Sequence, residues 1–245
     1  MSRPATLFIV FLIVVIVGVV SFVTFYLGTG FSKLTFDPER RRQPLVLLSL
    51  ERFGPEHQSE RYEQFQRSRT TAFQSYDYDV VFEGSSWLSS EGNRREQWNR
   101  VAIESFPFTA NFVNAATDPA YTAIEDWFDE ENFDEFGQFV GHVKLTQSFK
   151  KPVVLLLSDT TADSQRALIQ VVNETLAPFS GHIAFATPVV KIGGNTELAI
   201  NYFAFIEFDD AGEMMNWLVN TIRKSRFAQL RRHMDNLSLV VATPS

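Results

Sequence analysis

Cysteine is absent from all 245 residues of the chain. Its absence excludes disulfide bonds, thiolate metal sites and cysteine nucleophiles, and it fits either side of a membrane. Histidine is scarce too, with 4 residues: His142 has no second histidine or carboxylate at ligand spacing, and the other three are lone histidines. The sequence therefore predicts no metal site and no cofactor.

Basic residues are fewer than acidic ones, with 22 Lys and Arg against 29 Asp and Glu, which gives a net charge of −7. Binding to nucleic acid needs a basic face, so nucleic acid is excluded as a partner. The chain also lacks the GxSxG, P-loop, GxGxxG, HExxH and EF-hand patterns. The sequence thus assigns no catalytic residue and favours a protein that is not an enzyme.

Charge is missing altogether between Arg3 and Lys33, and residues 7–27 are mostly Leu, Ile, Val and Phe. A helix of this length spans roughly 32 Å, which matches the ~30 Å hydrocarbon core of a bilayer. We therefore expect a single membrane-spanning helix that anchors the rest of the chain. A cleaved signal peptide is the competing interpretation, but its apolar region is shorter, at about 7–15 residues.

Three consecutive arginines, Arg40, Arg41 and Arg42, follow this apolar stretch. Under the positive-inside rule they favour a cytoplasmic domain, though only slightly over a periplasmic one, because long domains translocate regardless of charge. Their position suits contact with anionic lipid headgroups; a solvated flank that only sets topology is the alternative. Within the stretch, Gly18 and Ser21 offer a small-residue face where a helix of another subunit could pack.

The order of predicted elements repeats along the chain. Residues 44–147 read as strand, helix, two strands, helix and strand, and residues 152–243 follow the same order. Phe106 and Phe208 end the third strand of each copy. This βαββαβ order is the ferredoxin-like motif, so we predict an α+β chain with two tandem ferredoxin-like repeats. The predicted domains are residues 1–34, 35–148 and 149–245.

The predicted strands are apolar on both faces. Residues 153–157, for example, are apolar at every position. A single ferredoxin-like sheet would leave one face in water and would alternate apolar and polar residues along each strand. We therefore expect the two sheets to pack against each other within the chain, helices outside, as an intramolecular pseudo-dimer in the form of a sandwich or barrel.

The first repeat carries a further pattern: its third strand ends in Phe106-Pro107, the next helix contains Phe112, and Pro119-Ala120-Tyr121 follows. This pattern, over residues 44–122, resembles the domain of unknown function 1330 family of the dimeric α+β barrel proteins. The resemblance implies the fold. It implies little about function, because the relatives of that family include oxygenases, haem-handling enzymes and binding modules.

Strand alternation predicts where a small molecule would bind. If Val101 and Ile103 face the helices, Arg100 and Glu104 point into the space between the sheets. A polar cluster in an apolar space is the usual setting of a ligand pocket, and ion pairs at the sheet ends are the alternative. The ligand-binding candidates are Ser49, Glu51, Arg100, Glu104, His142 and Lys144.

An acidic run over residues 126–135 is interleaved with aromatic residues. Aromatic side chains ringed by charge are typical anchors of protein interfaces, and a solvated face with buried rings is the alternative. The run lacks the ligand spacing of a calcium loop. The partner-docking candidates are Trp127, Phe128, Phe133 and Phe136, together with Gly18 and Ser21.

Two functions remain open on this basis. In the first, the chain is a non-catalytic accessory or scaffold subunit, held in the cell membrane by one helix, that docks on and stabilises an integral membrane complex. In the second, the barrel binds or transforms a small apolar or aromatic ligand, as an oxygenase-like or haem-binding protein. The expected partners are the lipid bilayer and other membrane subunits, and the second function adds a small molecule.

Overall fold

The structure is a computed structural model that describes residues 39–53, 60–91, 98–121, 135–223 and 236–244. The predicted membrane-spanning stretch, residues 7–27 with Gly18 and Ser21, lies outside the described residues. None of the helices in the described part of the chain is both long and apolar enough to span a bilayer.

The first repeat has the predicted βαββαβ order and is preceded by a short 3-10 turn, η1 (Arg40–Arg42). Each strand is apolar or uncharged at most positions, which suits a sheet that is covered on both faces. Its elements are β1 (Leu45–Arg52), α3 (Glu60–Gln74), β2 (Asp79–Glu91), β3 (Arg100–Phe106), α4 (Thr109–Ala116) and β4 (Glu135–Gly141).

The second repeat has the same order. Its first helix begins after Thr161, whose side chain accepts a hydrogen bond from the backbone N–H of Ser164, the usual way to satisfy the free donors of a helix start. Its elements are β5 (Val153–Asp159), α6 (Ala162–Leu176), β6 (Gly181–Gly193), β7 (Tyr202–Phe208), α7 (Ala211–Arg223) and β8 (Asn236–Pro244).

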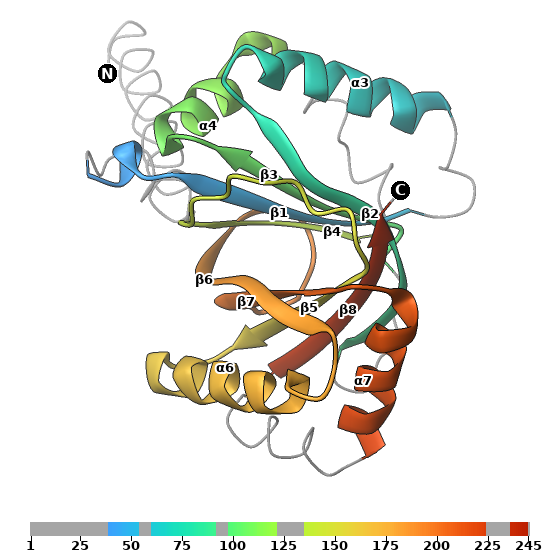
Figure 1. Ribbon diagram of the computed structural model, residues 1–245. Coiled ribbons are helices and arrows are strands. Elements are labelled where there is room, and N and C mark those ends of the chain that lie inside the picture. Colours follow the sequence, from blue (N-terminus) through green and yellow to red (C-terminus); the bar gives the residue numbers. More distant parts are fainter. Residues whose placement is uncertain (1–38, 54–59, 92–97, 122–134, 224–235, 245) are drawn as a thin grey trace, which may run out of the picture.

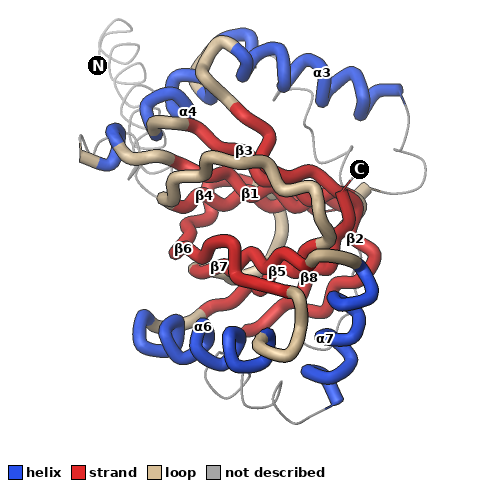
Figure 2. Tube along the Cα trace, viewed as in Figure 1, coloured by secondary structure: helices blue, strands red, loops and turns tan. Residues whose placement is uncertain are grey.

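The eight strands close into one barrel, in the order β1-β3-β2-β8-β5-β7-β6-β4. The two sheets meet edge to edge, where β2 pairs with β8 and β4 pairs with β6. Closure leaves no open sheet edge, which removes the exposed donors and acceptors that promote aggregation. Figures 1 and 2 show the helices α3 and α4 outside one half of the barrel and α6 and α7 outside the other. The α+β fold is as predicted, and of the two predicted arrangements it is the barrel.

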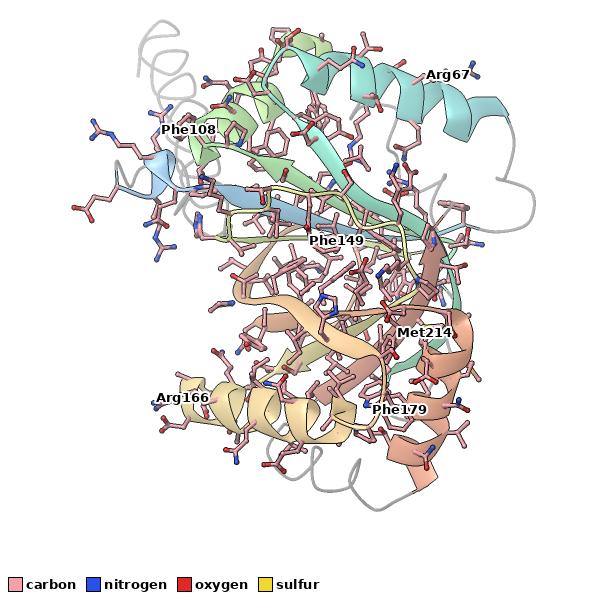
Figure 3. The ribbon with its side chains drawn as sticks, in the orientation of Figure 1. Arg67, Phe108, Phe149, Arg166, Phe179 and Met214 are labelled. Carbon is pink, nitrogen blue, oxygen red and sulfur yellow. The ribbon has the colours of Figure 1, made fainter. Side chains whose placement is uncertain are left out.

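The barrel interior is an apolar cluster with contributions from both repeats. Phe149, in the connection between the repeats, lies between the two sheets, and its backbone N–H donates to Val81 O at 2.8 Å (Figure 3). The ring of Phe205 is 4.8 Å from that of Phe149, 5.1 Å from Phe185 and 5.5 Å from Phe82, centroid to centroid. Aromatic side chains therefore bridge the two halves at the centre of the barrel.

Two further apolar clusters lie outside the barrel, each belonging to one repeat. In the first repeat, Phe73 of α3 and Phe112 of α4 pack on the sheet with Phe106. In the second, Trp217 of α7 packs against Phe208, and its indole N–H donates to Thr175 Oγ1 at 3.1 Å. Each sheet is thus buried on both faces, which explains why its strands show so little polar alternation.

Candidate functional site

Four of the six ligand-binding candidates lie beneath the helices of the first repeat and not inside the barrel. Val101 and Ile103 belong to the interior cluster together with residues of the second repeat. Because strand residues alternate between faces, their neighbours point outward, toward α3 and α4. The predicted orientation was therefore wrong: both faces are apolar, so alternation identified the two sets of residues but not which set faces inward. The outward set comprises Ser49, Glu51, Arg100 and Glu104.

Two of the candidates are separated from this set. His142 lies just after β4, and its ring Nδ1 is 3.2 Å from the carbonyl oxygen of Pro44, at the start of β1. Lys144 is exposed to solvent. Glu51 lies near the other end of β1, where it pairs in register with Arg100. The structure therefore brings together four of the six predicted residues, and His142 and Lys144 belong to a different region.

The centre of the site is a buried ion pair that the sequence did not predict. Arg69 of α3 is 1% exposed, and its Nη2 donates to Oε2 of Glu104, which is 0% exposed. Tyr78, just before β2, donates its phenolic O–H to Glu104 Oε1 at 3.2 Å. We call Arg69, Tyr78 and Glu104 the buried carboxylate site.

The protonation states of this site follow from its surroundings. Burial is the largest single influence and lowers the pKa of the Arg69 guanidinium, but the attractions of Glu104, Tyr121 and Glu51 together outweigh it, so the pKa is raised. Burial, and then the charge of Glu104, raise the pKa of the Tyr78 phenol far above its ordinary value. Arg69 is therefore charged and Tyr78 is a neutral hydrogen-bond donor over the whole physiological range.

A second ion-pair group borders the site. Arg100 donates from Nη1 to Glu51 Oε1 at 2.9 Å and from Nε to Glu83 Oε1 at 2.7 Å. Glu51 and Arg100 are buried, whereas the side chain of Glu83 is 42% exposed. This group therefore connects the buried carboxylate site with the surface.

Several buried donors of the site have no acceptor within the described part of the chain. They are Nε and Nη1 of Arg69 and the hydroxyl of Ser49. On β1, Ser49 lies between Leu47, which pairs with Glu104, and Glu51. Its side chain is therefore on the same face as both ion-pair groups. Buried polar groups are nearly always hydrogen-bonded, so these donors need an explanation.

Aromatic rings enclose the site on one side. The ring of Phe73 lies 4.9 Å from that of Tyr121, 5.3 Å from Tyr78 and 5.5 Å from Phe106. The guanidinium carbon of Arg69 is 5.4 Å from the centroid of Phe73, within the range of a cation–π interaction. The buried charges thus lie at the edge of an aromatic cluster.

In its described residues the second repeat has no such site, as its strands show. Ile103 of β3 and Phe205 of β7 both point into the barrel and pair with the middle of the first strand of their repeat. They are therefore equivalent positions. One residue further along, Glu104 in the first repeat corresponds to Ile206 in the second, and both are fully buried.

The helices show the same replacement. Phe73 near the end of α3 and Leu176 at the end of α6 are buried against the sheet of their repeat. One turn earlier in each helix lie Arg69 and Val172, which is 0% exposed. The ion pair of the first repeat is thus replaced by a valine and an isoleucine in the second.

The remaining candidates are only partly described. Phe136 lies in β4, where its backbone N–H donates to Asn195 Oδ1 at 2.8 Å and its carbonyl accepts from Thr196 N at 3.0 Å. Trp127, Phe128 and Phe133 lie outside the described residues. Arg40, Arg41 and Arg42 form η1 and are exposed.

A closed eight-stranded barrel built from two ferredoxin-like units, with its helices outside, has the architecture of the dimeric α+β barrel proteins, and the predicted fold is thereby confirmed. The chain is similar in structure to an anthrone oxidase-like protein, with 7% identity, a TM-score of 0.50, and coverage of 82% of this chain and 91% of that one. It is also similar to a chlorite dismutase from Candidatus Nitrospira defluvii in complex with imidazole, with 10% identity, a TM-score of 0.46, and coverage of 87% and 94%. A monooxygenase-like protein from Fusobacterium nucleatum subsp. nucleatum gives 8% identity, a TM-score of 0.47, and coverage of 82% and 92%.

No protein-family model and no curated protein sequence matches the chain. The narrower resemblance to the domain of unknown function 1330 family therefore stays a prediction. At identities this low, similarity between structures establishes the fold and not the activity, which has to be argued from the site.

The raised pKa of Tyr78 leads to a testable pH dependence. Free tyrosine ionises near pH ~10. Because the folded chain holds the Tyr78 proton more tightly than the unfolded chain, its contribution to stability is complete below that pH and is lost as the pH rises toward the folded pKa. We expect urea denaturation to show a smaller loss of stability between pH 8 and alkaline pH for Tyr78→Phe than for the wild type. Equal losses would contradict this assignment.

Proposed function

We propose that the chain binds a small aromatic ligand with an acceptor oxygen, on the helix-covered face of its first repeat. The observation that carries the proposal is that Arg69 is buried and charged but has acceptors for only part of its guanidinium. An aromatic ketone or carboxylate would place an oxygen against Nε or against Nη1 of Arg69. Its ring would lie against the cluster formed by Phe73 and its aromatic neighbours.

The second repeat supports this proposal. Removing one acceptor from a buried donor costs about 1–3 kcal/mol, and replacing a buried ion pair by apolar residues is often neutral or stabilising. Val172 and Ile206 show that this fold accommodates the apolar replacement at the equivalent positions. We therefore expect the polar residues Arg69 and Glu104 to be dispensable for folding, and departures from packing rules of this kind are characteristic of functional sites.

One fold neighbour supports the same class of ligand. It is described as an anthrone oxidase-like protein, and an anthrone is an aromatic ketone with one acceptor oxygen. Oxygenase-like chemistry in this chain would extend the proposal. In that case the neutral phenol of Tyr78 would act as a donor and not as a base, because its pKa is raised.

Ligand binding is testable with two probes, anthrone and benzoate, by titration calorimetry. We expect the wild type to bind at least one of them, and the double variant Arg69→Val with Glu104→Ile, which copies the second repeat, to bind about 10–100-fold more weakly because a charge-assisted hydrogen bond is lost. Val172→Ala, at the position in α6 that corresponds to Arg69, is the matched control and should keep wild-type affinity. Unchanged affinity in the double variant, or no binding by the wild type, would contradict the proposal.

The membrane association predicted from the sequence remains part of the proposed function. The apolar residues 7–27 would anchor the barrel in the cell membrane, with a slight preference for the cytoplasmic side. Such an anchor suits a protein whose ligand is apolar and concentrates in lipid. The role of accessory subunit stays a prediction, because Trp127, Phe128 and Phe133, on which it mainly depends, are outside the described residues.

A further inference from the structure

One end of the first repeat exposes an aromatic side chain beside a basic turn. Phe108, at the start of α4, is 51% exposed, more than any other large hydrophobic residue in the described part of the chain. The 3-10 turn η1, with three exposed arginines, contacts α4. Figure 3 shows Phe108 at the same end of the molecule as this turn. We call Arg40, Arg41, Arg42 and Phe108 the basic–aromatic corner.

Backbone hydrogen bonds hold this corner together. Thr109, the first residue of α4, donates from its backbone N–H and from its hydroxyl to the carbonyl of Gln43, at 2.7 and 3.0 Å. Gln43 in turn donates its N–H to the carbonyl of Arg40 at 2.9 Å. Because Thr109 is fully buried, Phe108 and η1 are fixed next to each other by the fold.

The second repeat shows that Phe108 is an unusual residue for its position. At the equivalent helix start, Asp210 accepts a hydrogen bond from the N–H of Glu213 at 2.9 Å, which is ordinary capping by an aspartate. Phe108 occupies the capping position of α4 and has no side-chain acceptor. Helix α4 thus lacks a side-chain cap and instead has a large apolar side chain in solvent beside three exposed arginines, a combination that suits a partner outside the barrel.

We propose that the basic–aromatic corner docks on an anionic lipid bilayer, with the arginines on the headgroups and Phe108 in the interfacial region. Charge complementarity supports this partner, because anionic lipid attracts the three arginines of η1, whereas the chain as a whole carries −7. Chain connectivity supports it as well. The apolar stretch ends at residue 27, so residues 28–39 confine the corner to roughly 40 Å from the membrane.

The inference rests on the proposed membrane anchor and adds an orientation to it. The side of the first repeat that bears η1 and the start of α4 would face the lipid, and α7, on the other side of the barrel in Figure 1, would face water. The buried carboxylate site lies in the layer between α3 and the same sheet. Docking at this corner would therefore hold the ligand-binding repeat, and not the second repeat, at the membrane surface.

The absence of cysteine makes a labelling experiment direct. In the full-length chain, Pro107→Cys next to Phe108 and Ala211→Cys at the start of α7 are each labelled with an environment-sensitive fluorophore. Each chain is then reconstituted in nanodiscs of phosphatidylglycerol and phosphatidylcholine that contain nitroxide-bearing lipid. We expect quenching at position 107 to be several-fold stronger than at position 211. It should also fall at high salt, which screens the arginines.

Two changes to the corner complete the test. Phe108→Asp copies the capping residue of the second repeat, so it should keep or raise the melting temperature while it reduces the quenching at position 107. Replacing the three arginines of η1 by glutamine should have the same effect on quenching. Equal quenching at positions 107 and 211, or quenching that is the same in pure phosphatidylcholine, would overturn the inference. Failure of the chain to migrate with the discs would instead contradict the membrane anchor itself.

Discussion

Replacing Glu104 alone by isoleucine should lower the free energy of unfolding by about 3–5 kcal/mol, because it leaves the guanidinium of Arg69 buried without its carboxylate. Arg69 is 1% exposed, so water replaces the lost carboxylate poorly. Tyr78 loses its acceptor as well, but its side chain is only partly buried and can turn to solvent. Chemical denaturation followed by circular dichroism measures the effect.

The double variant Arg69→Val with Glu104→Ile should recover most or all of the stability that Glu104→Ile loses. Both buried charges are then gone, and the packing resembles that of Val172 and Ile206 in the second repeat. Buried ion pairs that are replaced by apolar residues of similar volume often leave stability unchanged or higher. A double variant as unstable as the single one would instead show that the ion pair is needed for folding.

The stability of the double variant and its ligand affinity, taken together, distinguish a structural role of the ion pair from a role in ligand binding. If the double variant is stable but no longer binds the probe, the ion pair serves binding and not folding. The second repeat then represents the purely structural form of the same unit. If the double variant is stable and still binds, the ligand site lies elsewhere and the unpartnered donors of Arg69 have another cause.

The fold could be predicted from the sequence because several weak signals agree. Element order repeats, Phe106 and Phe208 end equivalent strands, and the strands are too apolar for a sheet with one wet face. Which face of each strand points into the barrel could not be predicted. Leu47 and Leu48 are both fully buried, one toward the helices and one inside the barrel, so hydrophobicity gives no preference for either face. Only the pairing of strands that are distant in the sequence determines which face lies inside the barrel.

The candidate site was predicted only in part for a similar reason. Glu104 was found because a charge inside an apolar strand is conspicuous, but its partner is on a helix with many polar residues. Arg67 and Arg69 lie two positions apart in α3, and one is exposed while the other is buried. Nothing local distinguishes them. Alignment of the two repeats could have done so, since Arg69 corresponds to a buried valine.

The second large effect is expected inside the barrel, where Phe205→Ala should lower the free energy of unfolding by about 3–5 kcal/mol. The Phe205 ring contacts Phe82 of the first repeat, Phe149 of the connection and Phe185 of β6. Its removal therefore leaves a cavity at the point where the two repeats meet. Phe108→Ala, which truncates a ring that is 51% exposed, is the control and should change stability by less than about 0.5 kcal/mol.

This variant also tests whether the barrel interior is a packed core or a ligand pocket. An apolar cavity left by a phenylalanine stays dry and binds benzene, so added benzene should restore part of the lost stability of Phe205→Ala and leave the wild type unaffected. If truncation of Phe205 costs less than about 1 kcal/mol, or if benzene stabilises the wild type to the same extent, the interior has room of its own. The search for the ligand site would then move from the helix-covered face of the first repeat to the space between the two sheets.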